Sequence, residues 1–166
     1  MGFCKKYLND DNTHIAFRTG KPIAGTPRYI SVNNHAGKEL SRRDDLEAAL
    51  YMMVFLAKGR LPWQDVTAAD IRKKYLQIGL MKHQMKAGEL CCDMPREYAA
   101  FLEYVRELEF EQRPAYQRWR AAFRGVLTRM GAAMENAEYD WNQAHEPQLH
   151  KSMPPPSLAE KKKTEE

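Results

Sequence analysis

The stretch SRRDDLEAALYMMVFLAKG, residues 41–59, predicts a helix at the centre of the fold. Ser41 with Asp44 three residues later is a weaker variant of the capping box that begins many helices. Residues 46–57 are apolar on nearly every face, and a helix of that kind must be surrounded by other elements. Gly59 is expected to end the helix. The core of the protein is therefore expected to form around this segment.

Three further helices are expected on its C-terminal side. A short one should start near Thr67, a second near Pro95 and a third near Pro114, since proline suits the first turn of a helix. Residues 79–94, between the first two, are predicted to be irregular. Apolar residues at three- and four-residue steps predict one buried face for each helix: Ile71, Tyr75 and Ile78; Tyr98, Phe101, Leu102, Val105 and Leu108; Tyr116, Trp119, Phe123, Leu127 and Met130.

Composition divides the chain into three regions. Residues 1–40 are rich in Asn, Gly, Thr and Pro and predict an irregular, loop-like segment. Residues 41–145 carry the helical patterns. Residues 146–166, EPQLHKSMPPPSLAEKKKTEE, contain three consecutive prolines and a block of mixed charge, which together predict a disordered tail. The expected fold class is therefore mainly α.

Charge and cysteine content restrict the classes of partner. With 26 Lys and Arg against 22 Asp and Glu, the net charge of +4 suits a phosphate- or carboxylate-bearing protein partner and is too small to indicate nucleic acid. The three cysteines, Cys4, Cys91 and Cys92, form neither a disulfide framework nor a CxxC zinc motif. The sequence has no apolar run of 18 residues and no signal peptide, so no membrane partner and a cytoplasmic or nuclear location are expected.

A longer stretch that begins at Gly25, GTPRYISVNNHAGKELSRRDDLEAALYMMVFLAKGRLPWQ, resembles the casein kinase I family of Ser/Thr protein kinases. It is similar to that family's activation segment and central helix, with Ser-Val-Asn at 31–33 in place of the Ala-Pro-Glu of other kinases. SRRDDLE at 41–47 and LPWQ at 61–64 also match. EYVRELEFEQRPAYQRWRAAFRGVL and YDWN further along resemble the end of the catalytic domain, so the resemblance covers roughly residues 2–142.

The resemblance implies a partial kinase C-lobe, made of the activation segment and about four helices, with the N-lobe and the catalytic loop absent. GFCKKY at 2–7 resembles the family from the glycine of its Asp-Phe-Gly motif onward. The magnesium-binding Asp, the glycine-rich loop and the phosphate-gripping Lys have no counterpart in these 166 residues. ATP and magnesium are thus implied for the parent family, while no catalytic, cofactor-binding or metal residue and no activity are expected of this chain alone.

The resemblance also implies a phosphate-binding pocket beside the activation segment. The matching positions are Arg28, whose guanidinium suits a bidentate phosphate contact, and Lys74, which adds a point charge. A third position, a glycine amide in the family, is Asp65 here, and its carboxylate repels phosphate. The pocket therefore requires Arg28 and Lys74 to converge with Asp65 turned away.

Four further residues match functional positions of the family. Gly25, Thr26 and Tyr29 belong to the activation-segment match. Asp45 matches the central-helix Asp that holds the catalytic loop in kinases. Without that loop, Asp45 is expected to be structural, as an acid near a helix start.

Three interpretations remain open. The chain is a truncated casein kinase I-like fragment that is inactive alone, a pseudokinase-like module that binds phosphorylated or acidic protein segments, or a subunit whose partner covers the central helix. The third arises because an upstream helix wraps part of the central helix in the family. Without it, several apolar side chains within residues 46–56 should meet water, so poor folding or a partner is expected. A redox role for vicinal Cys91 and Cys92 is a further alternative.

Overall fold

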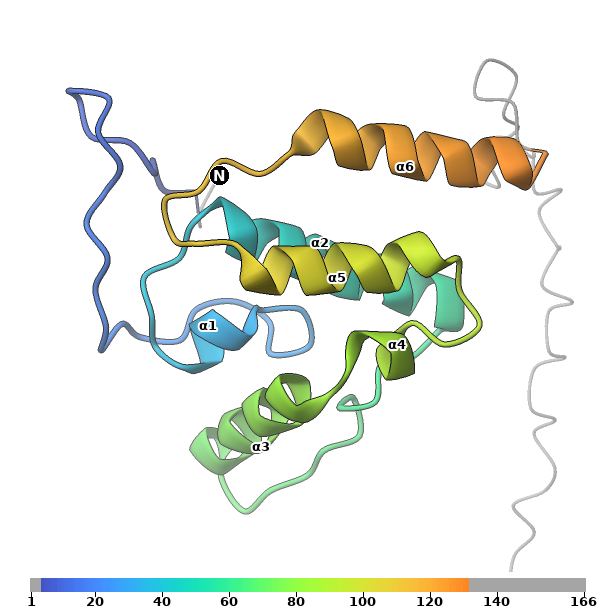
Figure 1. Cartoon of the computed structure of the whole chain (residues 1–166). Coiled ribbons are helices and arrows are strands. Elements are labelled where there is room, and N and C mark those ends of the chain that lie inside the picture. Colours follow the sequence, from blue (N-terminus) through green and yellow to red (C-terminus); the bar gives the residue numbers. More distant parts are fainter. Residues whose placement is uncertain (1–3, 132–166) are drawn as a thin grey trace, which may run out of the picture. The chain divides into compact units, whose positions relative to one another are not determined.

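The computed structural model describes residues 4–131, and residues 1–3 and 132–166 lie outside the described part. The predicted tail at 146–166 and the YDWN sequence at 139–142 fall outside it. Within residues 4–131 the chain is mainly helical, which confirms the expected class (Figure 1). The helices are α1 (Val32–His35), α2 (Arg42–Lys58), α3 (Ile71–Gln84), α4 (Ala87–Leu90), α5 (Arg96–Glu107) and α6 (Tyr116–Arg129). The region before α1 contributes one isolated antiparallel bridge, between Leu8 and His14.

Helix α2 starts and ends where the sequence predicts. The Asp44 carboxylate accepts a hydrogen bond of 2.8 Å from the backbone N–H of Ser41 at the start of the helix. At the other end Gly59 adopts φ 75°, a left-handed conformation that glycine reaches without strain. Its N–H donates to the carbonyl oxygen of Phe55 at 2.8 Å and so closes the last turn.

The core forms around α2, which runs beside α5 (Figure 1). Leu50, Tyr51 and Val54 of α2 are fully buried. They pack with side chains from α5, from the LPWQ turn and from α3 and α4, namely Phe101, Leu102, Val105, Leu61, Trp63, Ile78 and Leu90. The Tyr51 and Trp63 rings meet edge to face with centroids 5.0 Å apart. The predicted position of the core at the central helix is thus observed.

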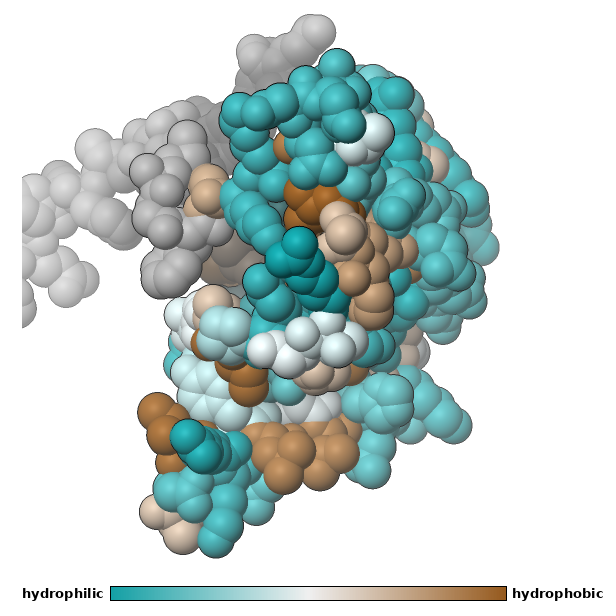
Figure 2. Space-filling view, turned by 90° about the vertical axis from the view of Figure 1, so that its left-hand side faces the viewer, coloured by the Kyte–Doolittle hydropathy of each residue, from teal (hydrophilic) through white to brown (hydrophobic). Residues whose placement is uncertain are grey.

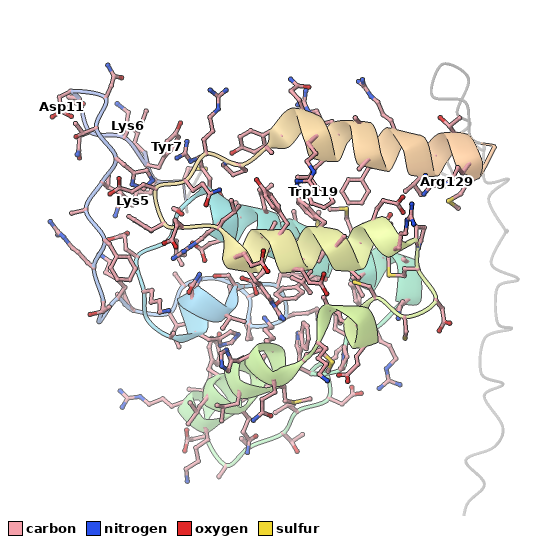
Figure 3. The ribbon with its side chains drawn as sticks, in the orientation of Figure 1. Lys5, Lys6, Tyr7, Asp11, Trp119 and Arg129 are labelled. Atoms are coloured by element: carbon pink, nitrogen blue, oxygen red, sulfur yellow. The ribbon has the colours of Figure 1, made fainter. Side chains whose placement is uncertain are left out.

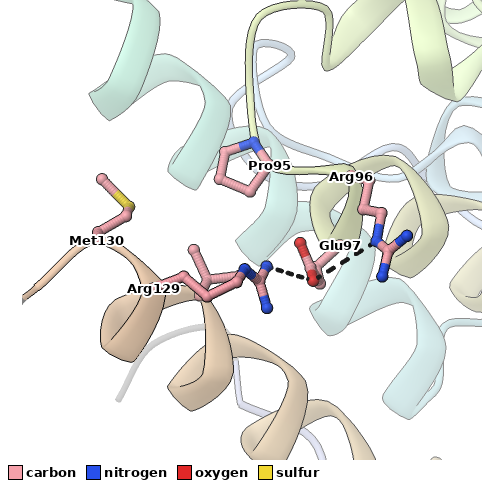
Figure 4. Close-up of a pocket in the computed structure, with 6 residues that line it drawn as sticks. Pro95, Arg96, Glu97, Arg129 and Met130 are labelled. Atoms are coloured by element: carbon pink, nitrogen blue, oxygen red, sulfur yellow. Dashed lines mark hydrogen bonds and ion pairs between the residues drawn. The ribbon is translucent and has the colours of Figure 1, made fainter.

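Helix α6 packs on α5 through aromatic rings. Phe101 of α5 lies 4.9 Å from the Trp119 ring and 5.5 Å from the Phe123 ring, measured between centroids. At the far end of the pair, Arg129 of α6 donates to the Glu97 carboxylate at 2.5 Å beside a cavity of about 410 Å³ (Figure 4). The contact is therefore apolar along its length and closed by an ion pair.

The segment between α2 and α5 is more helical than the sequence predicts. Helix α3 begins at Ile71, four residues later than expected, because the side chain of Asp70 caps it by accepting from the N–H of Lys73. It continues to Gln84, and α4 follows, so residues 79–94 are not wholly irregular. Ile71, placed by its spacing on a buried face, is 70% exposed because it lies in the first turn at the open end of α3.

Large apolar side chains are exposed on α2, on α3, before α1 at Phe17 and Ile23, and on or next to α6, where Tyr116, Leu127 and Met130 are exposed although their spacing predicts a buried face. On α2, Met52 and Leu56 are 47% and 72% exposed, whereas Leu50 and Val54 are fully buried. Part of the central helix therefore faces outward in residues 4–131, as the sequence suggests. On α3, Ile71, Leu76 and Leu80 are exposed. They belong to the lower end of the described region, where Figure 2 shows hydrophobic surface.

Candidate substrate-binding face

A buried lysine binds the backbone of the segment before α1. The Nζ of Lys82, on α3, donates to the carbonyl oxygens of Pro27 and Ile30, each at 2.7 Å. Lys82 is fully buried, and its Nζ lies 4.9 Å from the Tyr51 ring centroid and 5.0 Å from that of Trp63. Burial lowers the pKa of this ammonium from 10.5 to about 7. Carbonyl dipoles and two ring faces thus surround one cation.

Gly25, Thr26 and Tyr29 share one turn in this segment. The carbonyl oxygen of Thr26 accepts from the N–H groups of Tyr29 at 2.9 Å and Ile30 at 3.2 Å. Gly25 has φ 103°, and a Cβ there would lie 2.9 Å from Cγ2 of Ile30, so only glycine fits. The Tyr29 ring meets the Phe55 ring of α2 edge to face, 5.9 Å between centroids. We call residues 25–31 the activation-segment turn.

Arg28 lies in this turn and is directed to an aromatic ring. Its guanidinium sits 5.0 Å from the ring centroid of Phe55, a cation–π distance. Its carbonyl oxygen accepts from Nε1 of Trp63 at 2.8 Å, which fixes the backbone at this position. Arg28 is therefore placed by α2 and by the LPWQ turn.

Lys74 lies in the first turns of α3, and its N–H donates to the carbonyl oxygen of Asp70. Among residues 4–131, no hydrogen bond, ion pair or ring contact links Arg28 to Lys74, so their convergence on a phosphate stays a prediction. Asp65 is exposed, and its carboxylate pairs with Arg60 at 2.7 Å. A neighbouring cation thus offsets the negative charge of Asp65, which the sequence places beside the predicted phosphate pocket.

Two buried carboxylates of α2 hold the far end of the activation-segment turn and the start of α1. Asp44 accepts from the Ser31 hydroxyl at 2.7 Å and from the Asn33 amide at 3.0 Å. Glu47 accepts from the N–H of Val32 at 3.2 Å and from the Tyr51 hydroxyl. Burial raises the pKa of Glu47. The beginning of α2 therefore positions the turn through directional hydrogen bonds.

Arg106 of α5 completes this buried network. Its guanidinium donates to the carbonyl oxygens of Met85 and Lys82 and to the Tyr51 hydroxyl. The Nε atom lies 3.8 Å from the Glu47 carboxylate. A single arginine thus ties α5, the end of α3 and α2 to the groups that hold the turn.

Asp45, expected to be structural, points outward. Its side chain is exposed at the rim of a cavity, and its pKa is raised by loss of surrounding water and by the charge of Asp44. Its neighbour Asp44 makes the hydrogen bonds instead. Asp45 lies in the first turn of α2, as expected from the sequence, and its structural role stays a prediction.

A basic cavity of about 440 Å³ lies between the N-terminal segment and the start of α2. Five cations and two carboxylates contribute to its lining: Lys5, Lys6, Lys21, Lys38, Arg42, Glu39 and Asp45. Figure 3 shows Lys5, Lys6 and Tyr7 together at the N-terminal end of the described chain. This basic cavity has the charge expected of a surface that binds acidic segments.

Glu39 organises one wall of the basic cavity. Its carboxylate is nearly buried and pairs with Lys5 at 2.6 Å and with Lys21 at 3.3 Å. The hydrogen bond from Lys5 is the main cause of the lowered pKa of Glu39. Because one carboxylate serves two lysines, the cavity keeps excess positive charge. The guanidinium carbon of Arg42, which also lines the cavity, lies 4.4 Å from the centroid of the Tyr7 ring.

The comparisons with known proteins agree on one family. Casein kinase I homolog 1 of Schizosaccharomyces pombe is 40% identical over 139 residues, which are 82% of this chain and 31% of that protein. This chain is casein kinase I-like. Casein kinase I homolog 2 of the same yeast is 39% identical over 138 residues, and casein kinase I homolog RAG8 of Kluyveromyces lactis is 38% identical over 142 residues. No family profile matches the sequence.

The casein kinase I-like chain spans about a third or less of the length of these relatives, namely 31%, 32% and 26%. The identities confirm the resemblance stated from the sequence. Among residues 4–131, no group of three or more His, Cys, Asp or Glu side chains could hold a metal ion. No helix in the same part of the chain is long and apolar enough to cross a bilayer.

Sequence reasoning missed several residues of this face. Lys82 and Arg106 lie far along the chain from the turn that they support, and nothing in the sequence around Lys5 indicates a role for it. A possible signal was the position of Lys82 one turn after Ile78, in a segment that otherwise supplies core residues. No sequence pattern could have predicted that Lys5 and Glu39 form an ion pair, since 34 positions separate them.

Proposed function

We propose that this casein kinase I-like chain is a substrate-binding part of a Ser/Thr protein kinase. The whole kinase would transfer the γ-phosphate of ATP to protein Ser or Thr, while the 166-residue chain binds acidic or phosphorylated protein segments and transfers no phosphate alone. A cytoplasmic or nuclear location belongs to the proposal. The identity of 40% to casein kinase I homolog 1, over 82% of this chain, supports the assignment to a kinase of this family.

The basic cavity carries the substrate-binding part of the proposal. It combines several lysines with a nearly buried Glu39 that orients two of them. Phosphate and carboxylate groups bind where such cations converge and are partly shielded from water. The adjoining activation-segment turn is fixed by Lys82 and Asp44, so an extended peptide that lies along it would meet a preformed surface.

Binding of a fluorescent acidic phosphopeptide to the full chain, followed by anisotropy at low salt, tests this role. We expect Lys6→Glu and Lys38→Glu to weaken binding by about tenfold each, since each replaces an attractive charge by a repulsive one. Lys86→Glu is the matched control, because Lys86 is exposed and lies outside the cavity. Equal losses in all three variants would reduce the effect to net charge and contradict the proposal.

A phosphoryl-transfer assay tests the second part of the proposal, that the 166-residue chain transfers no phosphate alone. With ATP, magnesium and an acidic protein substrate, we expect no transfer by the 166-residue chain. The reason is that phosphoryl transfer depends on positioned metal ions and phosphate-gripping groups, for which the sequence has no counterpart. Transfer that copurifies with the chain and disappears in Asp44→Asn would contradict the expected inactivity.

A second candidate is a pseudokinase-like module that binds phosphate at Arg28 and Lys74. The observation that favours it is the pairing of Asp65 with Arg60, which offsets the unfavourable charge. In the same anisotropy assay, a loss on Arg28→Ala and Lys74→Ala, with little effect of Lys6→Glu, would select this site over the basic cavity.

A further inference from the structure

The C-terminal end of α2 touches the turn between α4 and α5 through a lysine and a cysteine. Nζ of Lys58 donates to Sγ of Cys92 at 3.1 Å, and the two residues are 34 positions apart. Lys58 is the last residue of α2 and is held by the left-handed Gly59 that follows. Asp93, next to Cys92, also has a positive φ of 62°. The backbone is thus sharply turned next to both residues, and the hydrogen bond brings the nitrogen and the sulfur together.

The surroundings of the pair favour chemistry at Cys92 and disfavour it at its neighbour. Cys92 is exposed, whereas Cys91 is 4% exposed and belongs to the core cluster. Burial raises the pKa of the Cys91 thiol to about 11, which keeps it protonated and inert. A cavity of about 450 Å³ is lined in part by Lys58, Asp93 and Met94, and the thiol of Cys92 is itself exposed to dissolved oxidants. Exposed cysteines beside a cationic side chain are those that oxidise.

We propose that Lys58 and Cys92 form a reversible oxidative crosslink in which one oxygen atom joins Nζ to Sγ. Dioxygen is the oxidant. The lysine reacts as the neutral amine after loss of a proton from its ammonium. The S–H bond and one N–H bond break, the S–O and O–N bonds form, and the second oxygen atom leaves as water with the two hydrogens. Dioxygen thus gains four electrons from the amine nitrogen and the thiol sulfur.

The crosslink would act as a redox-sensitive tie between α2 and the α4–α5 turn. Two dithiol molecules supply the four electrons and four protons that return the thiol, the amine and water. Oxidation closes a covalent loop between residues 34 positions apart and removes conformational freedom from the unfolded chain. The oxidised protein is therefore the more heat-resistant form.

The test uses the full 166-residue chain, purified reduced and then kept in air-saturated buffer. We expect the intact monomer to gain the mass of one oxygen less two hydrogens, and a protease digest to contain the Lys58 peptide joined to the Cys92 peptide. Dithiothreitol should restore the starting mass. Lys58→Arg is the matched variant, because arginine keeps the charge and the hydrogen-bond donor but has no primary amine to join; it should show no crosslink.

Three results would overturn the proposal. A loss of two hydrogens without added oxygen would indicate a Cys91–Cys92 disulfide. In that case the mass loss would be absent in Cys91→Ser. Addition of oxygen without a joined peptide would indicate ordinary oxidation of the thiol. An unchanged mass would show that the pair does not react with dioxygen. Melting temperature gives a second readout: it should rise on oxidation and fall again with dithiothreitol in the natural sequence, and stay constant in Lys58→Arg.

Discussion

The activation-segment turn and helix α6 are both held against the core, by opposite means. Buried charged groups hold the turn: Lys82 binds two of its carbonyl oxygens, and Asp44 binds Ser31 at its end. Aromatic rings hold α6, chiefly Phe101 against Trp119 and Phe123. Hydrogen bonds to charged groups depend on the protonation state of those groups, whereas the packing of aromatic rings does not. The first arrangement therefore fixes the backbone of the turn in a way that depends on pH, and the second is expected to contribute stability that does not depend on pH.

The largest effect is expected on the aromatic side. Phe101→Ala should lower the free energy of unfolding by about 4 kcal/mol, because it removes a buried ring and leaves a cavity. The loss, measured by urea denaturation, should be equal at pH 7 and pH 9. Tyr116→Ala is the control, since that ring lies on α6 and is 39% exposed. A control loss as large as that of Phe101→Ala would contradict the assignment of the stability to buried rings.

On the polar side, Lys82→Met should cost about 3 kcal/mol, since two buried carbonyl groups lose their donor while the volume of the side chain is kept. It should also release the activation-segment turn, so trypsin should cut after Arg28 faster than in the natural sequence. Lys86→Met, at an exposed lysine, should change neither quantity. A stability loss without faster cleavage at Arg28 would show that Lys82 does not position the turn.

The pH dependence of stability distinguishes the two regions directly. The pKa of Lys82 is about 7 in the folded state against 10.5 for the free group, so the unfolded chain binds more protons between these values. Stability should therefore rise with pH, by about 2 kcal/mol from pH 7 to pH 9. This rise should be present in Phe101→Ala and absent in Lys82→Met. Urea midpoints measured at both pH values in all three proteins check the expectation, and a rise that persists in Lys82→Met would contradict it.

His35 adds a second pH window on the same side of the molecule. Burial lowers its pKa from 6.5 to about 4, so the unfolded chain binds the extra proton between these values. The contribution of His35 is complete above pH 6.5 and is lost as the pH falls toward 4. His35→Gln should flatten the acid side of the stability curve. An unchanged acid slope in that variant would assign the slope to other groups.

The sequence predicts the aromatic side well and the polar side poorly. Apolar spacing located α5 and α6, because a helix that buries one face repeats its apolar residues locally. On α6, however, the predicted stripe is only partly buried: Trp119 packs in the core, whereas Tyr116, Leu127 and Met130 are exposed. A buried charged residue leaves no comparable pattern in the neighbouring sequence. Lys82 is explained only by carbonyl groups 52 and 55 positions away. A lysine in a mixed sequence is ordinarily solvated, so spacing alone gives no reason to place it in the core.

The candidate site shows the same division. The structure places Gly25, Thr26 and Tyr29 in one turn, and their role in an activation segment stays a prediction. The resemblance gave Arg28 and Lys74 as partners, but whether they converge depends on how α3 lies against the turn, which no motif encodes. The basic cavity was missed because its lysines come from separate parts of the chain, the Lys5-Lys6 pair and the single residues Lys21 and Lys38, each of which has the surroundings of ordinary surface.

The smallest effect is expected on the outward face of α2, which neither buried charges nor rings cover in residues 4–131. Leu56 is 72% exposed, so Leu56→Glu should change the free energy of unfolding by less than about 0.5 kcal/mol. Self-association, measured by sedimentation, should decrease because a charge interrupts the apolar surface shared with Met52.

Leu50→Glu, on the buried face of the same helix, provides the contrast and should prevent folding. If Leu56→Glu instead cost several kcal/mol, another part of the protein or a second copy would have to cover that leucine in solution. The exposed face of α2 would then form a third kind of contact, in which its apolar side chains are buried against another part of the protein or a second copy.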